Sequence, residues 1–189
     1  MITALQIIFS PLRAWEKIAK AQREVPRILL MHVFPLLLPG LALEGFSLVR
    51  LGERRGELDY LVKINEDLAI RYATLEFTLL LASVSIGALI VRWVTHSVQV
   101  RTPFTACFTL MAYGFSPIFL ARYFDAIPGL NTWVCWSLGA LLASSALYHG
   151  VGPALKPEQT KGFGLFLVSV IIVVFSSGLS HFVALALLH

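Results

Sequence analysis

Five long apolar runs, separated by short polar segments, occupy most of this chain of 189 residues. A hydrocarbon core about 30 Å thick requires roughly 20 mostly apolar residues of helix, and helices satisfy every backbone hydrogen bond there. The pattern therefore predicts an all-α membrane protein, a bundle of five transmembrane helices. The predicted spans are residues 26–49, 73–94, 104–121, 130–148 and 163–188.

The N-terminal segment has a different pattern and predicts an amphipathic helix. Ser10 is a suitable N-cap and Pro11 suits the first helical position. Apolar positions then recur at helical spacing around Trp15, while basic residues that include Lys17 and Lys20 fill the remaining positions. Such a helix is typical of one that lies at the headgroup level. It either docks lipids or a partner, or anchors the segment against the bundle.

We therefore divide the chain into an interfacial helix, residues 1–24, and a five-span domain, residues 25–189. Composition agrees, since 57% of the residues are hydrophobic, only 14% are charged, and the mean hydropathy is +0.77. A soluble domain of this size would need more polar surface. The net charge of +4 is dispersed over short flanks, so we expect lipids as partners and no nucleic acid.

The basic residues also predict an orientation. Nine Lys and Arg residues flank the spans on the side of the N-terminus, against six on the other side. Cytoplasmic loops carry the excess of basic residues in most membrane proteins. The N-terminus is therefore expected in the cytoplasm and the C-terminus outside.

Two further local patterns carry expectations. Apolar residues from Leu58 to Leu75 recur every three or four positions, which predicts that the second span begins outside the membrane as an amphipathic helix. Cys107 and Cys135 lie near the starts of successive spans, which run in opposite directions. The two thiols are then too far apart for a disulfide, and we expect packing residues.

Ionisable residues at membrane depth are costly and are candidates for function. Glu44, Glu76 and Arg122 all lie near the outer ends of their spans, so they share roughly one depth. An arginine between two carboxylates neutralises charge. The cluster is either an ion- or proton-handling site open to the outside, or a structural clamp near the interface.

Histidines form the second set of candidates. His32, His96 and His149 are expected near the inner side, and histidine is both a metal ligand and a proton carrier. No pair has metal-ligand spacing, so a metal site would require convergence in the fold. We favour the interpretation that these histidines form hydrogen bonds at the membrane interface, and we expect no cofactor. His181 lies in a serine-rich stretch of the fifth span, which either packs tightly against a neighbour or lines a polar pocket. We favour packing.

Three segments contain motifs that are similar to those of a known family. SPLRAWEKIA (10–19) contains an N-terminal Pro-x-x-x-Trp element. AYGFSPIFLARYFDAIPGL (112–130) contains a Tyr and an internal Pro in the third span. ALYHGVGPALKPEQTKGFGLFLVSVII (146–172) forms the connection between spans four and five. In this order, the three segments resemble the bacterial branch of the Yip family of membrane proteins, in which an apolar residue is expected where His149 stands.

The resemblance implies five spans with a cytoplasmic N-terminus, and no established reaction. Eukaryotic relatives are associated with membrane traffic and Rab GTPases, a role that does not transfer to a bacterial inner membrane. The leading hypothesis is a non-catalytic scaffold, adaptor or membrane-organising subunit, whose partner is a second copy or another membrane protein. The alternatives are a small transporter or channel component using Glu44, Glu76 and Arg122, and a lipid-acting enzyme with metal at the histidines.

Overall fold

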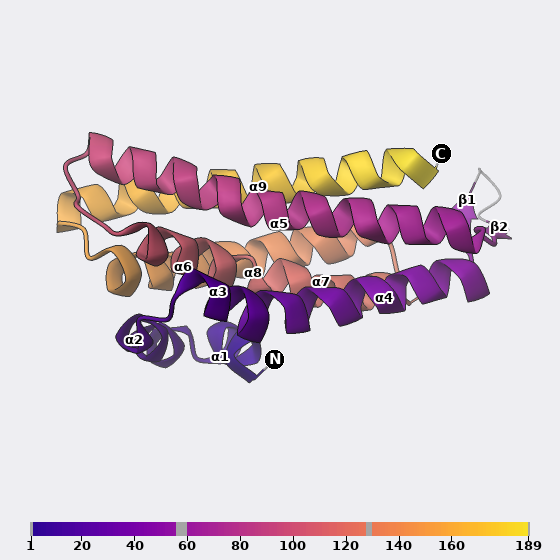
Figure 1. The fold of residues 1–189 in the computed structure, drawn as a ribbon, viewed down its shortest axis with the longest axis horizontal. Coiled ribbons are helices and arrows are strands. Elements are labelled where there is room, and N and C mark those ends of the chain that lie inside the picture. The colour runs from indigo at the N-terminus through magenta and orange to yellow at the C-terminus, as the bar shows by residue number, and fades with distance from the viewer. Residues whose placement is uncertain (1, 56–59, 128–129, 189) are drawn as a thin grey trace.

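The computed structural model describes residues 2–55, 60–127 and 130–188, which form an elongated helical bundle (Figure 1). Most of the described chain is helical, with one short hairpin at one end. The elements are α1 (Ile2–Phe9), α2 (Pro11–Ala21), α3 (Val25–Ile28), η1 (Leu29–Val33), α4 (Phe34–Arg50), β1 (Glu53–Arg55), β2 (Tyr60–Val62), α5 (Glu66–Ser97), α6 (Phe104–Gly114), α7 (Ser116–Asp125), α8 (Thr132–Leu155) and α9 (Gln159–Leu188).

In the described part of the chain, five stretches of helix are long and apolar enough to cross a membrane, as the sequence predicted. The α6–α7 span lies at the centre, because 67% of its apolar window is buried inside the protein, whereas α9 buries only 22% and lies at the periphery. The five candidate spans are Val25–Arg50, Glu66–Ser97, Phe104–Asp125, Thr132–Leu155 and Thr160–Ala186.

Prolines interrupt the regular helix in the first and third spans. A proline inside a helix removes one hydrogen bond and clashes with the carbonyl four residues earlier. In the first span, the π-helical turn η1 directly precedes the turn that contains Pro35, and wider turns of this kind accommodate such an interruption. In the third span, the helix ends at Gly114 and restarts with Pro117 in the first turn of α7.

The connection between α4 and α5 differs from the expected helical extension. Tyr60–Val62 forms β2, which pairs antiparallel with β1, and α5 begins only at Glu66. The side chain of Asn65 accepts a hydrogen bond of 3.1 Å from the backbone N–H of Asp67 and caps the helix there. The prediction of a helix from Leu58 was therefore wrong for Tyr60–Val62, and residues 56–59 lie outside the described part.

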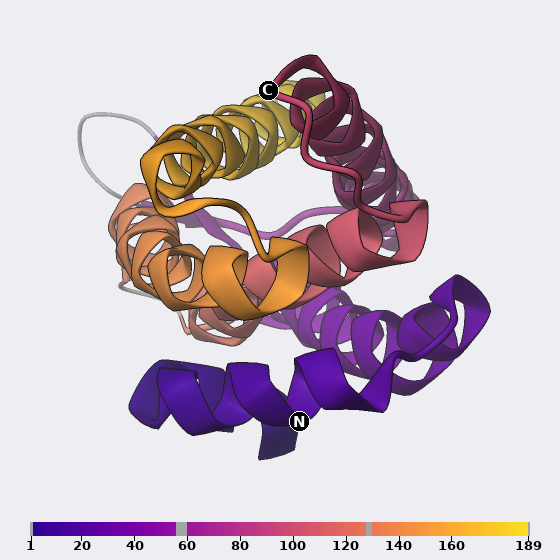
Figure 2. The ribbon, with the colours of Figure 1, turned by 90° about the vertical axis from the view of Figure 1, so that its left-hand side faces the viewer.

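The N-terminal segment forms two helices, and α2 lies crosswise to the spans (Figure 2). Its apolar side faces the bundle, where Ala14, Trp15 and Ile18 are buried. Trp15 packs against α8 at Gly150, where a Cβ atom would lie 2.5 Å from the indole ring. Only glycine at position 150 permits this approach.

The spans also pack closely where small residues meet. A Cβ atom at Gly139 of α8 would lie 2.9 Å from the Cβ of Ala121 on α7, so glycine allows these two helices to touch. Cys107 and Cys135 are both buried and both free, in agreement with the expectation that they form no disulfide.

Candidate functional site

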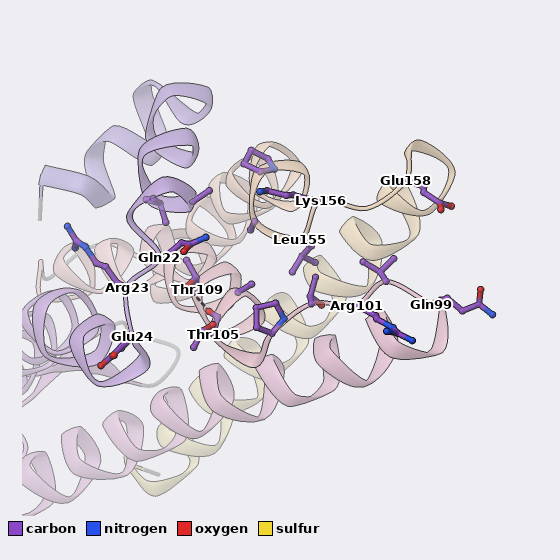
Figure 3. Close-up of a pocket in the computed structure, with 18 residues that line it drawn as sticks. Gln22, Arg23, Glu24, Gln99, Arg101, Thr105, Thr109, Leu155, Lys156 and Glu158 are labelled. Carbon is purple, nitrogen blue, oxygen red and sulfur yellow. Dashed lines mark hydrogen bonds between the residues drawn. The ribbon is translucent and has the colours of Figure 1, made fainter.

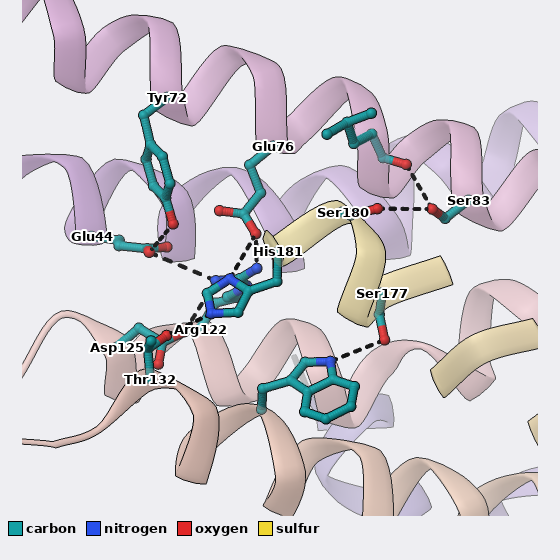
Figure 4. Close-up of polar contacts among 12 residues, drawn as sticks. Glu44, Tyr72, Glu76, Ser83, Arg122, Asp125, Thr132, Ser177, Ser180 and His181 are labelled. Carbon is teal, nitrogen blue, oxygen red and sulfur yellow. Dashed lines mark hydrogen bonds and ion pairs between the residues drawn. The ribbon is translucent and has the colours of Figure 1, made fainter. Parts of the chain in front are cut away.

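Polar side chains from all five spans meet near the hairpin end of the bundle (Figure 4). The first span contributes a carboxylate from α4, and α5 contributes a tyrosine and a second carboxylate. The third span contributes an arginine and an aspartate from α7, while α8 and α9 contribute one residue each. We call this group the ion cluster: Glu44, Tyr72, Glu76, Arg122, Asp125, Thr132 and His181.

Arg122 is the centre of the ion cluster. Its Nη2 atom forms an ion pair with Oε1 of Glu76. Its Nη1 atom lies 3.2 Å from Oδ2 of Asp125 and 3.7 Å from Oε1 of Glu44. One guanidinium thus contacts carboxylates on three different spans, which fixes α4, α5 and α7 relative to one another.

Contacts of Tyr72 and His181 extend the ion cluster on either side of Arg122. Tyr72 donates a hydrogen bond of 2.6 Å from its hydroxyl to Oε1 of Glu44. On the other side, Nδ1 of His181 lies 3.5 Å from Oε1 of Glu76, and its Nε2 lies 2.9 Å from the hydroxyl of Thr132. These contacts bring α8 and α9 into the same network.

The ion cluster is closed to solvent. The side chains of Arg122 and Glu76 are 3% and 0% exposed, and that of Glu44 is 7% exposed. One guanidinium cannot neutralise three carboxylates, and an uncompensated buried charge is very costly. We therefore expect the cluster to retain at least one proton, on a carboxyl group or on His181.

The predicted trio of Glu44, Glu76 and Arg122 is thus brought together, but the sequence reasoning missed the other members. Tyr72 precedes Glu76 by one helical turn and Asp125 follows Arg122 by three residues, so helical spacing contained a signal for both. His181 was assigned to packing instead. It is fully buried beside Trp133, with ring centroids 5.0 Å apart.

The fold does not bring His32, His96 and His149 together into one metal site. No group of three His, Cys, Asp or Glu side chains suited to a metal ion occurs among the described residues. His96 is exposed near the end of α5, and the ring of His149 packs on Tyr148. His32 is buried, and its Nε2 atom lies 2.7 Å from the hydroxyl of Ser116.

The contact between His32 and Ser116 pairs a histidine with a hydroxyl, the arrangement that activates a nucleophile in some enzymes. Ser116 has no exposed surface, and the His32 ring is covered by Tyr113, with ring centroids 4.0 Å apart. A substrate has no access to the hydroxyl in this arrangement. The pair links the first and third spans as a buried hydrogen bond inside the bundle, whereas hydrogen bonding at the membrane interface was expected for His32.

The residues predicted for the interfacial helix separate into two environments. Trp15 is buried against the bundle, whereas Lys17 and Lys20 point away from it and are exposed. Pro11 occupies the first turn of α2, as expected. The large apolar residues that remain exposed on this segment are Leu12 on α2 and Leu5 and Phe9 on α1.

Comparison with known proteins gives one match. The family model for the Yip1 domain matches residues 5–180, which include α2, the first four spans, most of the fifth span and every member of the ion cluster except His181. No curated protein and no solved structure matches the chain.

Proposed function

The chain belongs to the Yip1 domain family of integral membrane proteins, and on that premise we propose that it is a non-catalytic scaffold or adaptor. Its five spans form a rigid body that organises lipids and holds a second copy or another membrane protein. We further propose the inner membrane of a bacterial cell as its location, with the N-terminus in the cytoplasm and the hairpin outside.

The closed ion cluster is the observation that carries this proposal. It joins all five spans through side chains that, apart from the half-buried Thr132, are almost entirely excluded from solvent. A transport site needs a path by which water or an ion reaches the charged groups. Three cavities are lined by described residues, two of them at the end of the bundle opposite the hairpin and one in the groove between α4 and α5 at Leu41. No member of the ion cluster lines any of these three. The network therefore supports a clamp better than a conduction pathway.

The surfaces available for a partner lie at the periphery. The outward face of α9 presents large apolar side chains that include Ile171, Phe175 and Phe182. The N-terminal helices present Phe9 and Leu12. Helices associate in membranes through packing of such faces, and a scaffold needs faces that its own fold leaves uncovered.

Site-specific photocrosslinking in intact membranes tests the proposal. A photoreactive residue is placed at Leu12 or at Phe175, with Leu110 as the control because its side chain is fully buried. We expect a defined second copy or a defined membrane protein to be captured at one of the two exposed positions, in fixed stoichiometry and not at Leu110. Capture of lipid alone at both positions would contradict the scaffold function.

A further inference from the structure

A basic cavity lies at the end of the bundle opposite the hairpin (Figure 3). Its volume is about 660 Å³, and it is formed where the end of α2, the start of α6 and the end of α8 meet. Apolar side chains that include Ile18, Val100 and Leu155 line part of it, and Thr102 and Thr105 also line the wall. The cavity thus combines an apolar portion with hydroxyl groups at the end of the spans.

Cations outnumber anions around this cavity. Arg23, Arg101 and Lys156 line it, and a neighbouring cavity of about 830 Å³ shares the segment 99–103 and adds Arg92 and His96. Within the described part of the chain, no ion pair joins Arg92, Arg101 or Lys156 to a carboxylate.

Two acidic residues also line the first cavity, but one of them is engaged elsewhere. The carboxylate of Glu158 lies 3.0 Å from the ammonium of Lys161, which reduces its effect on the basic side chains. Glu24 is the remaining carboxylate in the wall. The net positive charge of the lining favours an anion.

Three residues in the cavity wall have a left-handed backbone conformation. Gln22, Gln99 and Lys156 have positive φ angles of 39°, 60° and 48°, and these are the non-glycine residues with positive φ in the described part. All three line the cavity, at the ends of α2, α5 and α8. A left-handed residue commonly ends a helix, and glycine adopts this conformation without strain. The chain therefore carries a small amount of backbone strain at three polar residues of the cavity wall.

We propose that this cavity binds the phosphate group of an anionic lipid headgroup. Guanidinium and ammonium groups bind phosphate oxygens strongly, and basic pockets between helices at the membrane surface hold anionic headgroups. The apolar lining suits the glycerol and the first methylene groups of the same lipid. In the view of Figure 3, Thr105 and Thr109 lie between Arg23 and Arg101, nearer to Arg23.

Helix ends offer a competing explanation for the basic residues. The last carbonyl groups of α2, α5 and α8 lie at this end of the bundle, and they attract cations without any ligand. That attraction predicts basic side chains but no saturable binding of phosphate. Binding measurements therefore separate the two explanations.

Native mass spectrometry of the full chain in a neutral detergent provides the test, with phosphatidylglycerol as the probe and phosphatidylcholine as the neutral lipid. The double variant Arg101→Gln/Lys156→Gln removes two lining cations. The matched control Arg13→Gln/Arg27→Gln removes two exposed cations on the same side that line neither cavity. Thermal unfolding of each variant establishes that the fold is intact.

We expect the cavity variant to bind phosphatidylglycerol at least ~10-fold more weakly, with the control within about twofold of wild type. Equal losses of phosphatidylglycerol affinity in both variants would show a general attraction to the basic surface, and the proposed site would be wrong. It would also be wrong if neither variant lost affinity. Competition experiments with inorganic phosphate and glycerol phosphate show whether the bound phosphate belongs to a lipid or to a soluble compound. If either displaces the lipid at comparable concentration, the ligand is a soluble phosphate compound and the lipid assignment is wrong.

Discussion

Arg122 on α7 and Glu76 on α5 form an ion pair between side chains that are only 3% and 0% exposed. The same guanidinium contacts Asp125 and Glu44, and Glu76 contacts His181 on the last span. The order and angle of the spans are therefore fixed near the hairpin end by charge pairing as well as by apolar packing.

Removal of the arginine should destabilise the protein strongly. In Arg122→Ala, three carboxylates lose their shared cation inside the bundle, and breaking a buried ion pair from one side costs about 3–5 kcal/mol. The free energy of unfolding in mixed micelles measures the effect. Arg71→Ala is the control, because Arg71 forms an exposed pair with Asp67 at 2.9 Å and its loss should cost less than about 1 kcal/mol. Equal costs for the two variants would rule out the clamp.

Neutralisation of Glu44 should be tolerated. An amide oxygen in Glu44→Gln still accepts the hydrogen bond from the Tyr72 hydroxyl, and the substitution reduces the excess of carboxylates around Arg122. We expect the unfolding free energy to stay within about 1 kcal/mol of wild type. Tyr72→Phe removes the donor from a buried carboxylate and should cost about 1.5–3 kcal/mol. A larger loss for Glu44→Gln than for Tyr72→Phe would show that the ionised carboxylate at position 44 is required.

Docking of α2 on the bundle depends on Gly150. A methyl group at this position would overlap the Trp15 ring, so Gly150→Ala should cost about 1–3 kcal/mol and expose α2 to limited proteolysis. Gly152→Ala on the same helix is the matched control, since no atom lies within 4 Å of its Cβ position, and alanine there should be neutral or stabilising. If proteolysis of α2 is equally slow in both variants, the contact between Trp15 and Gly150 does not hold the segment.

The orientation can be tested by labelling cysteines from one side of the membrane. Lys17→Cys and Arg71→Cys place exposed thiols at opposite ends of the bundle, while the native Cys107 and Cys135 are buried. A membrane-impermeant maleimide added to intact cells should label position 71 and reach position 17 only after permeabilisation. The reverse pattern would place the N-terminus outside.

Sequence alone predicted the spans because membrane thickness leaves a direct signal in the length of each apolar run. It also predicted a shared depth for Glu44, Glu76 and Arg122, because position along a helix converts to depth in the membrane at about 1.5 Å per residue. Depth does not reveal which side of a helix faces inward. His181 was therefore assigned to packing, although it faces Glu76.

Two other features depend on contacts between distant parts of the chain. His32 and Ser116 are 84 residues apart, and nothing in the local pattern around either residue points to the other. The basic cavity likewise combines residues from the ends of α2 and α8 and from the start of α6. At the hairpin, helical periodicity from Leu58 to Leu75 misled the prediction, because alternation over a strand as short as Tyr60–Val62 is too brief to be recognised.

Proton flux into reconstituted liposomes tests the central claim most directly, which is that the ion cluster is a closed clamp and not a pathway. Wild type, Glu44→Gln and Glu76→Gln are compared with protein-free liposomes under an imposed pH gradient and membrane potential. We predict that wild type gives no flux above protein-free liposomes. Flux through wild type that Glu76→Gln abolishes, in a variant that retains its fold, would contradict the clamp and identify a proton pathway through the cluster.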